Sequence, residues 1–134
     1  MDVATRELVR QRAIQRCEYC HIPDHALDLP FHVEHIVASI HRPDNRPSNL
    51  AWFCPRCNLK KGPNLTTIDP ETDQPVDLYN PRAMTWTDHF VVHDAEVISI
   101  TSCGRGTVRL LDLNNHLRVQ HRRLLIEQDD FDLD

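Results

Sequence analysis

Long apolar runs are missing from this sequence. None of its segments approaches the roughly 20 consecutive apolar residues that a membrane-spanning helix requires. Residues 1–16 carry alternating charges and include no apolar core of a signal peptide. We therefore expect neither a leader nor an anchor, and the cytoplasm is the default location. Internal repeats and low-complexity segments are absent as well.

A surplus of positive charge is also missing, since the formal net charge is −5 at pH 7. This balance does not favour long-range attraction to nucleic acid, which is a polyanion. Locally the sign reverses in two basic stretches, which are Arg56, Lys60 and Lys61 in one and Arg118, Arg122 and Arg123 in the other. Much of the acid lies in residues 127–134. A bound divalent cation would supply further positive charge where a phosphate must lie.

What is present is the composition of an ordinary folded protein. Apolar residues make up 40% of the chain and charged residues 26%, which argues against wholesale disorder. A chain of 134 residues is long enough for one domain with a modest core and too short for two comfortable ones. We expect a single domain over residues 1–134. Residues 1–63 would form a core with an N-terminal helix, residues 64–128 a loop and an extension packed on that core, and residues 129–134 an acidic tail.

Propensity and periodicity predict short elements in the first half of the chain. A helix is expected over residues 5–16, where Leu8, Val9, Ala13 and Ile14 can share one face. After it we expect a short β-prone run over 31–37, a loop over 39–48, a strand over 50–53, and a turn leading into a short helix over 54–61. Gly62 and Pro63 end that helix.

The second half contains weaker signals. Residues 64–81 are rich in Pro, Asp and Thr without periodicity, which predicts an ordered loop that wraps around the domain. A hairpin is expected over 89–101 with its turn at His93-Asp94, and Gly104 and Gly106 interrupt the pattern after the hairpin. Residues 107–113 are compatible with strand or helix. The last prediction is a helix to about Gln128, capped by Asn114 or Asn115, with an apolar side of Leu117, Leu124 and Leu125.

Five cysteines are the strongest signal, because Cys17, Cys20, Cys54 and Cys57 form two CxxC pairs while Cys103 stands alone. In a reducing compartment the pairs indicate one tetrahedral metal site and not disulfides. The 33 residues between Cys20 and Cys54 exceed the roughly 15–20 of a plain zinc ribbon, so the ion must close a loop that holds a motif of its own. Buried free cysteines or a redox pair are the alternatives. Cys103 is expected to be a packed, inert thiol.

That motif is the run FHVEHIV at residues 31–37, followed by Asn49-Leu50 and by CNLKK at residues 57–61. The first two of these segments lie between the CxxC pairs, and the third begins at the last cysteine of the second pair. In this order, residues 17–62 resemble the HNH endonucleases. The resemblance implies an α+β protein with a ββα-metal core, a structural four-cysteine zinc site and a C-terminal α/β extension. Beyond residue 62 the likeness is looser. NPR at 80–82, Trp86, HF at 89–90, GRG at 104–106 and LN at 113–114 are similar to a group of small stand-alone bacterial HNH proteins.

The resemblance also implies roles for individual residues. His35 matches the general base, and neutral imidazole suits that role near pH 7. Glu34 and the side-chain oxygen of Asn58 match the ligands of one catalytic cation, for which hard oxygen donors favour Mg²⁺ or Mn²⁺. Glu34 is a departure from the commoner aspartate, and Asn58 could instead cap the helix that follows it. Asn49 matches the residue that pins the loop orienting the histidine.

Other residues near this motif leave alternatives open. His32 would share a strand face with Glu34, where it could assist the metal or a phosphate or merely lie nearby. The Gly-Gly common in the family after the histidine is replaced by residues 42–45, Arg-Pro-Asp-Asn, which leaves the shape of that loop open. Trp52, Trp86 and Phe90 are expected in the core and not as base-stacking platforms.

The implied activity is divalent-metal-dependent hydrolysis of phosphodiester bonds in DNA that leaves 5′-phosphate and 3′-hydroxyl ends, with RNA not excluded as substrate. Arg56, Lys60 and Lys61 would contact the nucleic-acid backbone, unless they are an ordinary solvated face. The alternative is a non-catalytic zinc module that binds nucleic acid or a protein. Such a module would have no reason to keep together the set Glu34, His35, Asn49 and Asn58. A transferase or another metal hydrolase using the same fold is a third possibility. The sequence contains no indication of oligomeric state.

Overall fold

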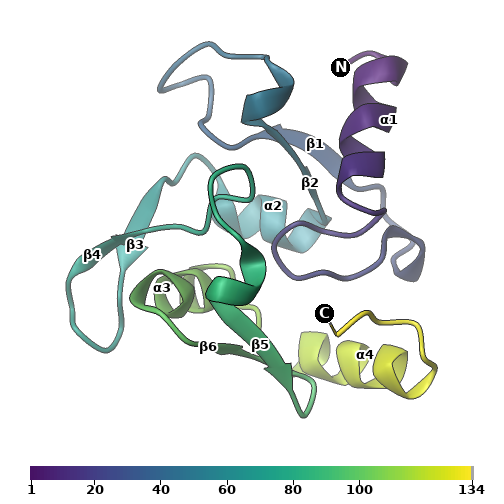
Figure 1. The fold of residues 1–134 in the computed structure, drawn as a ribbon, viewed down its shortest axis with the longest axis vertical. Coiled ribbons are helices and arrows are strands. Elements are labelled where there is room, and N and C mark those ends of the chain that lie inside the picture. Colours follow the sequence, from purple (N-terminus) through teal and green to yellow (C-terminus); the bar gives the residue numbers. More distant parts are fainter. Residues whose placement is uncertain (134) are drawn as a thin grey trace. The chain divides into compact units, whose positions relative to one another are not determined.

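The computed structural model describes residues 1–133 and divides the chain into two compact units. Unit 1 is Met1–Asn64 and unit 2 is Leu65–Asp134. Helices and short antiparallel hairpins occur in both units, as an α+β protein requires, and Figure 1 labels them along the chain. In the described part of the chain, no helix has the length and apolar character needed to span a membrane. The predicted packing of residues 64–128 on the core stays a prediction.

Unit 1 begins with α1, Val3–Arg12, which starts two residues earlier and ends four residues earlier than predicted. Asp2 caps it by accepting a hydrogen bond from the Thr5 amide. The helix ends because Ile14 and Gln15 take positive φ angles of 57° and 52°. The predicted apolar face was half wrong, since Val9 and Ala13 are buried whereas Leu8 and Ile14 are exposed.

The centre of unit 1 is a hairpin followed by a helix. Strand β1, His32–His35, pairs antiparallel with β2, Leu50–Phe53, so that Glu34 lies opposite Ala51 and His35 opposite Leu50. All four residues of β2 are buried, and helix α2, Pro55–Lys61, begins directly after it. Short 3-10 turns, Asp24–Ala26 and Pro47–Asn49, flank β1 in sequence. This ββα succession confirms the predicted fold class.

Unit 2 opens with a hairpin where the sequence predicted a loop. Strand β3, Thr66–Ile68, pairs antiparallel with β4, Pro75–Asp77. The prediction over residues 64–81 was wrong in this respect, because strands of three residues are too short to show periodicity. Pro75 stands at the first position of its strand, which is one of the few strand positions that tolerate proline.

A second hairpin and a helix come next in unit 2. Strands β5, Phe90–His93, and β6, Glu96–Ser99, form the predicted hairpin, although its turn lies at Asp94-Ala95. Helix α3, Ser102–Leu110, settles the ambiguity over residues 107–113 as helix up to Leu110 and includes both glycines that seemed to interrupt the pattern. A β-carbon on Gly104 would lie 2.6 Å from the carbonyl oxygen of His89, so close packing requires glycine there.

The last helix, α4, is His116–Glu127, and Asn115 caps it as predicted. Its predicted apolar side was wrong at two of three positions, because Leu117 and Leu124 are exposed. Leu125 is buried as predicted, together with Arg118 and Arg122. Two of the three arginines in the second basic stretch therefore face the interior of unit 2. Trp86 and Phe90 lie in the core of this unit, as expected. The predicted acidic tail over residues 129–134 ends at Asp134, which lies outside the described residues.

Candidate metal and catalytic site

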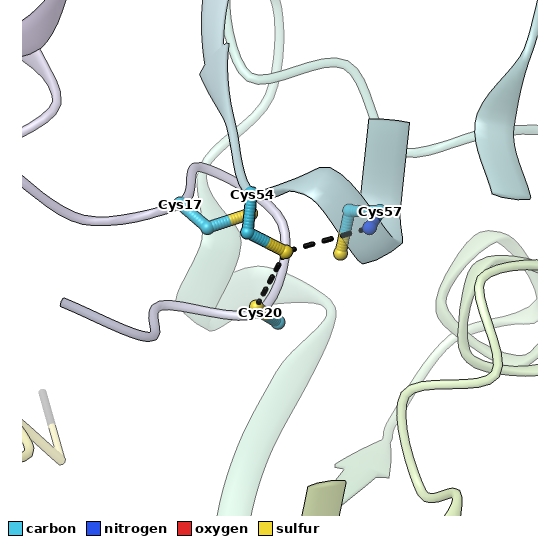
Figure 2. A group of neighbouring side chains, drawn as sticks. All are labelled: Cys17, Cys20, Cys54 and Cys57. Carbon is cyan, nitrogen blue, oxygen red and sulfur yellow. Dashed lines mark hydrogen bonds between the residues drawn. The ribbon is translucent and has the colours of Figure 1, made fainter. Parts of the chain in front are cut away.

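Four cysteines converge in unit 1 (Figure 2). Cys17 and Cys20 lie in the turn after α1, while Cys54 directly follows β2 and Cys57 lies in the first turn of α2. All four are buried, and their sulfur atoms lie within 4.8 Å of one another. This is the cluster that the two CxxC pairs predict. Within residues 1–133 it is the only group of three or more His, Cys, Asp or Glu side chains close enough to share an ion.

The surroundings of the cluster suit a metal ion. The backbone amide of Tyr19 donates to the Cys17 sulfur at 3.4 Å, and that of Cys57 donates to the Cys54 sulfur at 3.4 Å. Burial raises the pKa of the Cys17 and Cys57 thiols, so without a cation these sulfurs would stay protonated. A bound cation reverses that preference because thiolates are its ligands. Four sulfur donors in a closed, buried shell are typical of structural zinc.

Strand β1 carries three residues that the sequence singled out. His32, Glu34 and His35 are each partly exposed, so their side chains are accessible from the surface of unit 1. His32 and Glu34 are two positions apart and share a face of the strand. No third acidic, histidine or cysteine ligand in the described residues completes a group with these two. An ion at Glu34 would therefore depend on a different kind of donor.

Asn58 of α2 is the residue that the structure brings to Glu34. The Asn58 Nδ2 atom lies 3.4 Å from the Glu34 Oε1 atom, although the two residues are 24 positions apart. The alternative that Asn58 caps the helix is wrong, because Cys54 occupies the N-cap position and Asn58 lies in the middle of the helix. Since Asn58 follows Cys57 directly, the cysteine cluster fixes the backbone that presents it.

A loop held by Asn49 lies after His35. The Asn49 side chain accepts from the Val37 amide at 2.9 Å and donates to the carbonyl oxygens of Val37 at 3.0 Å and of Asp44 at 2.9 Å. One buried amide thus joins both ends of the segment between residues 37 and 44. At the far end of this segment, the Asn45 Oδ1 atom lies 2.7 Å from the His35 Nε2 atom. No pattern in the sequence singles out Asn45 beyond its place in a loop.

The predicted basic contact residues differ in exposure. Arg56 and Lys60 project from α2 into solvent, whereas Lys61 is only 2% exposed. The Lys61 Nζ atom donates to the Ile36 carbonyl oxygen at 2.8 Å, which ties α2 to the residue after His35. Burial lowers the pKa of this ammonium, and the nearby Glu34 carboxylate raises it in part. A phosphate contact from Lys61 would therefore require the loss of an internal bond.

Comparison with known proteins agrees with this geometry. Residues 17–64 match the family model described as HNH endonuclease. The match begins at the first zinc-type cysteine and covers β1, β2 and α2. No curated protein and no solved structure matches the chain. Residues 17–64 are therefore an HNH endonuclease domain, of the kind that carries a four-cysteine zinc cluster.

Proposed function

We propose that the chain is a divalent-metal-dependent endonuclease that hydrolyses phosphodiester bonds in DNA. The observation that carries the proposal is the contact between Glu34 and Asn58 at 3.4 Å, with His35 directly after Glu34 in β1. Two side chains that each contain an oxygen able to bind a metal are in contact from different elements, and the strand residue after Glu34 is a histidine. A module that only binds zinc needs the cysteines and gains nothing from this arrangement.

The donor set suits a hard cation. The Glu34 carboxylate and the Asn58 amide oxygen would hold Mg²⁺ or Mn²⁺, and water would complete the shell because both ions retain several waters in proteins. When bound, such an ion stabilises negative charge on the phosphate and on the leaving oxygen. The cysteine cluster would hold structural zinc, which keeps Asn58 in place without taking part in the chemistry.

His35 would act as the general base. A neutral imidazole removes a proton from water as the water attacks phosphorus, and the bond to the leaving 3′ oxygen then breaks. The water proton passes to the imidazole, the leaving 3′ oxygen takes a proton from solvent water, and the products are a 5′-phosphate and a 3′-hydroxyl. His32 remains a candidate for assisting at the phosphate, on the same strand face as Glu34.

Substrate contact would be mainly to the DNA backbone. Arg56 and Lys60 are exposed on α2, the helix that also carries Asn58. Their contacts would be salt-sensitive, because each neutralised phosphate releases counterions. The net charge of −5 limits long-range attraction, so binding would depend on these local charges.

Plasmid nicking tests the proposal. Zinc-loaded protein is given supercoiled plasmid, single-stranded DNA or RNA with Mg²⁺, with Mn²⁺, or without a divalent ion. We expect cleavage of DNA in the first two lanes only. A lane without added ion is preferable to a chelator, because a chelator also removes zinc. If the zinc-loaded protein cuts none of these substrates with either ion, the non-catalytic zinc module becomes the better explanation.

Substitutions separate the base from the ligands. His35→Ala should lower the cleavage rate by about 10²–10⁴ while zinc content and fold persist. Glu34→Ala and Asn58→Ala should also lose activity, but excess Mn²⁺ should restore part of it, because these variants weaken ion binding. His41→Ala is the matched control, since His41 is an exposed histidine of the same unit whose Nε2 atom lies 2.9 Å from the Pro63 carbonyl oxygen. If His35→Ala cuts as fast as wild type, the base lies elsewhere and His32 is tested next.

A further inference from the structure

The loop after His35 brings a side chain to the imidazole that the sequence did not single out. The Asn45 Oδ1 atom lies 2.7 Å from the His35 Nε2 atom, which is a short hydrogen bond between side chains ten residues apart. We infer that Asn45 is a positioning residue that fixes the tautomer and the ring orientation of His35. The inference concerns the site of the proposed function, and its catalytic meaning rests on that function.

Asn45 is presented by a loop whose path is set at several points. Asp44 is buried, and its carboxylate accepts from the Arg46 amide at 3.1 Å and from the Arg46 guanidinium at 2.9 and 2.8 Å. The Asp44 carbonyl accepts from Asn49, the side chain that also holds Val37. The residues on both sides of Asn45 are therefore held in place, and Asp44 is tied through Asn49 to Val37, two residues after His35.

The bond has a chemical consequence because an amide oxygen only accepts hydrogen bonds. The His35 Nε2 atom must then carry the proton and donate it to Asn45. In a neutral imidazole the other nitrogen, Nδ1, is left with its lone pair. Nδ1 is therefore the atom able to take a proton from water. Without Asn45 the ring would be free to exchange tautomers and to rotate about its side-chain bonds, so a smaller share of molecules would present a basic nitrogen in the required direction.

The tautomer can be observed without any measurement of activity. Zinc-loaded protein with ¹⁵N-labelled histidine is studied by NMR at a pH well above the ordinary histidine pKa of about 6.5, where the rings are neutral. The His35 signals are assigned by their loss in His35→Ala. His41 provides an internal reference, because its Nε2 atom faces the Pro63 carbonyl, which also only accepts. We expect His35 to show the Nε2-protonated pattern that His41 shows.

Two variants complete the test. Asn45→Leu has a similar size but no acceptor, and we expect a mixture of tautomers together with a kcat for plasmid nicking about 10- to 100-fold lower and a nearly unchanged KM. Asn45→Asp keeps an acceptor and should keep the Nε2-protonated pattern and most of kcat. Unchanged zinc content and unchanged His41 signals show that the loop substitution leaves the domain folded.

The outcomes separate this inference from the proposed function. An Nδ1-protonated His35 in wild type, or a His35 pattern that Asn45→Leu leaves unchanged, overturns the positioning role even if the protein cuts DNA. The expected patterns in all three proteins support the positioning role even if no substrate is cut, in which case only the proposed function fails. An equal loss of kcat in Asn45→Asp and Asn45→Leu also overturns the inference, because it would show that the acceptor is not what matters.

Discussion

The two units are stabilised by different kinds of interaction. Each has some 60–70 residues, a size at which an apolar core alone stabilises a fold weakly. Unit 1 has a buried four-sulfur cluster. Unit 2 instead buries arginines: Arg122 donates to the carbonyl oxygens of Ala95 at 2.7 Å and Leu113 at 2.9 Å, and Arg118 donates to that of Leu111 at 2.8 Å. In unit 2, charged hydrogen bonds to backbone carbonyls thus take the place that a metal ion bound to the four cysteines would take in unit 1.

The comparison can be tested unit by unit because each unit contains one of the two tryptophans. Trp52 lies in β2 of unit 1, and Trp86 lies in unit 2, and both are buried. Fluorescence of a Trp86→Phe protein therefore reports unit 1, and fluorescence of a Trp52→Phe protein reports unit 2. With these two reporters, the stability of each unit can be measured while the other is perturbed.

Removing the metal should unfold unit 1 alone, which is the largest effect that we expect. Binding to structural four-ligand sites supplies about 10–16 kcal/mol in small zinc peptides, which is comparable to the whole stability of a small domain. Cys54→Ser, or prolonged chelation of wild type, should therefore abolish zinc content and the folded signal of Trp52 while Trp86 is unaffected. Cys103→Ser is the matched control and should change neither. A zinc-free, monodisperse protein with a folded Trp52 signal contradicts the prediction.

Removing a buried arginine should weaken unit 2 alone. Arg122→Met leaves two carbonyl oxygens without their charged donor, and we expect the free energy of unfolding of unit 2 to fall by about 2–5 kcal/mol. Denaturant titration followed at Trp86 measures this, with zinc content unchanged. The control is Arg123→Met, because Arg123 contacts the exposed carbonyl of Asp94 and should matter by less than about 1 kcal/mol. Equal effects of the two variants would show that burial of Arg122 is unimportant.

Acid should weaken unit 2 through one ion pair. Asp69 is fully buried, and the Arg105 guanidinium at 2.7 and 2.9 Å holds the pKa of its carboxyl well below the usual range. A lowered folded-state pKa stabilises the fold above the unfolded value of about 3.9, and this contribution is lost as the pH falls below it.

Asp69→Asn should therefore lower the stability of unit 2 at neutral pH and flatten its loss between about pH 4 and pH 2. The measurement is the denaturant midpoint of Trp86 fluorescence across this range. Glu71→Gln is the control, because Glu71 is an exposed carboxylate 3.2 Å from the same arginine. If the wild-type midpoint depends on pH as weakly as the midpoint of Asp69→Asn, the ion pair does not cause the acid sensitivity of unit 2.

The smallest effect concerns the basic residues on the surface. Neutralising Arg56 and Lys60 in α2 should reduce the salt dependence of DNA binding, with the slope of log K against log salt falling by about 1 for each phosphate that is no longer neutralised. Binding is measured without divalent ions in the His35→Ala protein, so that the DNA stays intact. Arg123→Gln, which changes an exposed arginine of unit 2, is the control. An unchanged slope after both α2 substitutions would identify them as an ordinary solvated face.

The sequence was most informative where a run of one residue type had clear borders or where reactive residues recurred at a fixed spacing. The strand over residues 50–53 was predicted with its observed bounds, because an apolar run lies between a polar loop and a CxxC pair. The four cysteines were predicted as one cluster because packing needs alone rarely produce two CxxC pairs. Glu34 and Asn58 were placed together by the family pattern, and the structure puts them in contact; their roles as ligands stay a prediction.

The remainder depends on contacts that no local pattern encodes. Helix α3 approaches the β3–β4 hairpin so closely at Gly106 that a β-carbon there would lie 2.7 Å from Thr67 and 2.8 Å from Val76. This contact explains why a glycine stands inside the helix. The buried face of α4 was missed because its arginines are polar residues, although their guanidinium groups satisfy distant carbonyls. Asn45 was missed for a similar reason, since its contact with His35 exists only once the loop has closed.

The hydrogen bonds of Asn49 hold the two ends of its loop in place whatever the length of the loop between them. Its side chain joins Val37 to Asp44, so residues 38–43 form a ring that is closed whatever it contains. The entropy of closing a flexible loop rises by only about 0.6 kcal/mol for each doubling of its length. Insertions within this ring would leave the spacing of His35 and Asn45 nearly unchanged. The ring is therefore a segment in which new sequence can be accommodated over evolutionary time without disturbing the histidine.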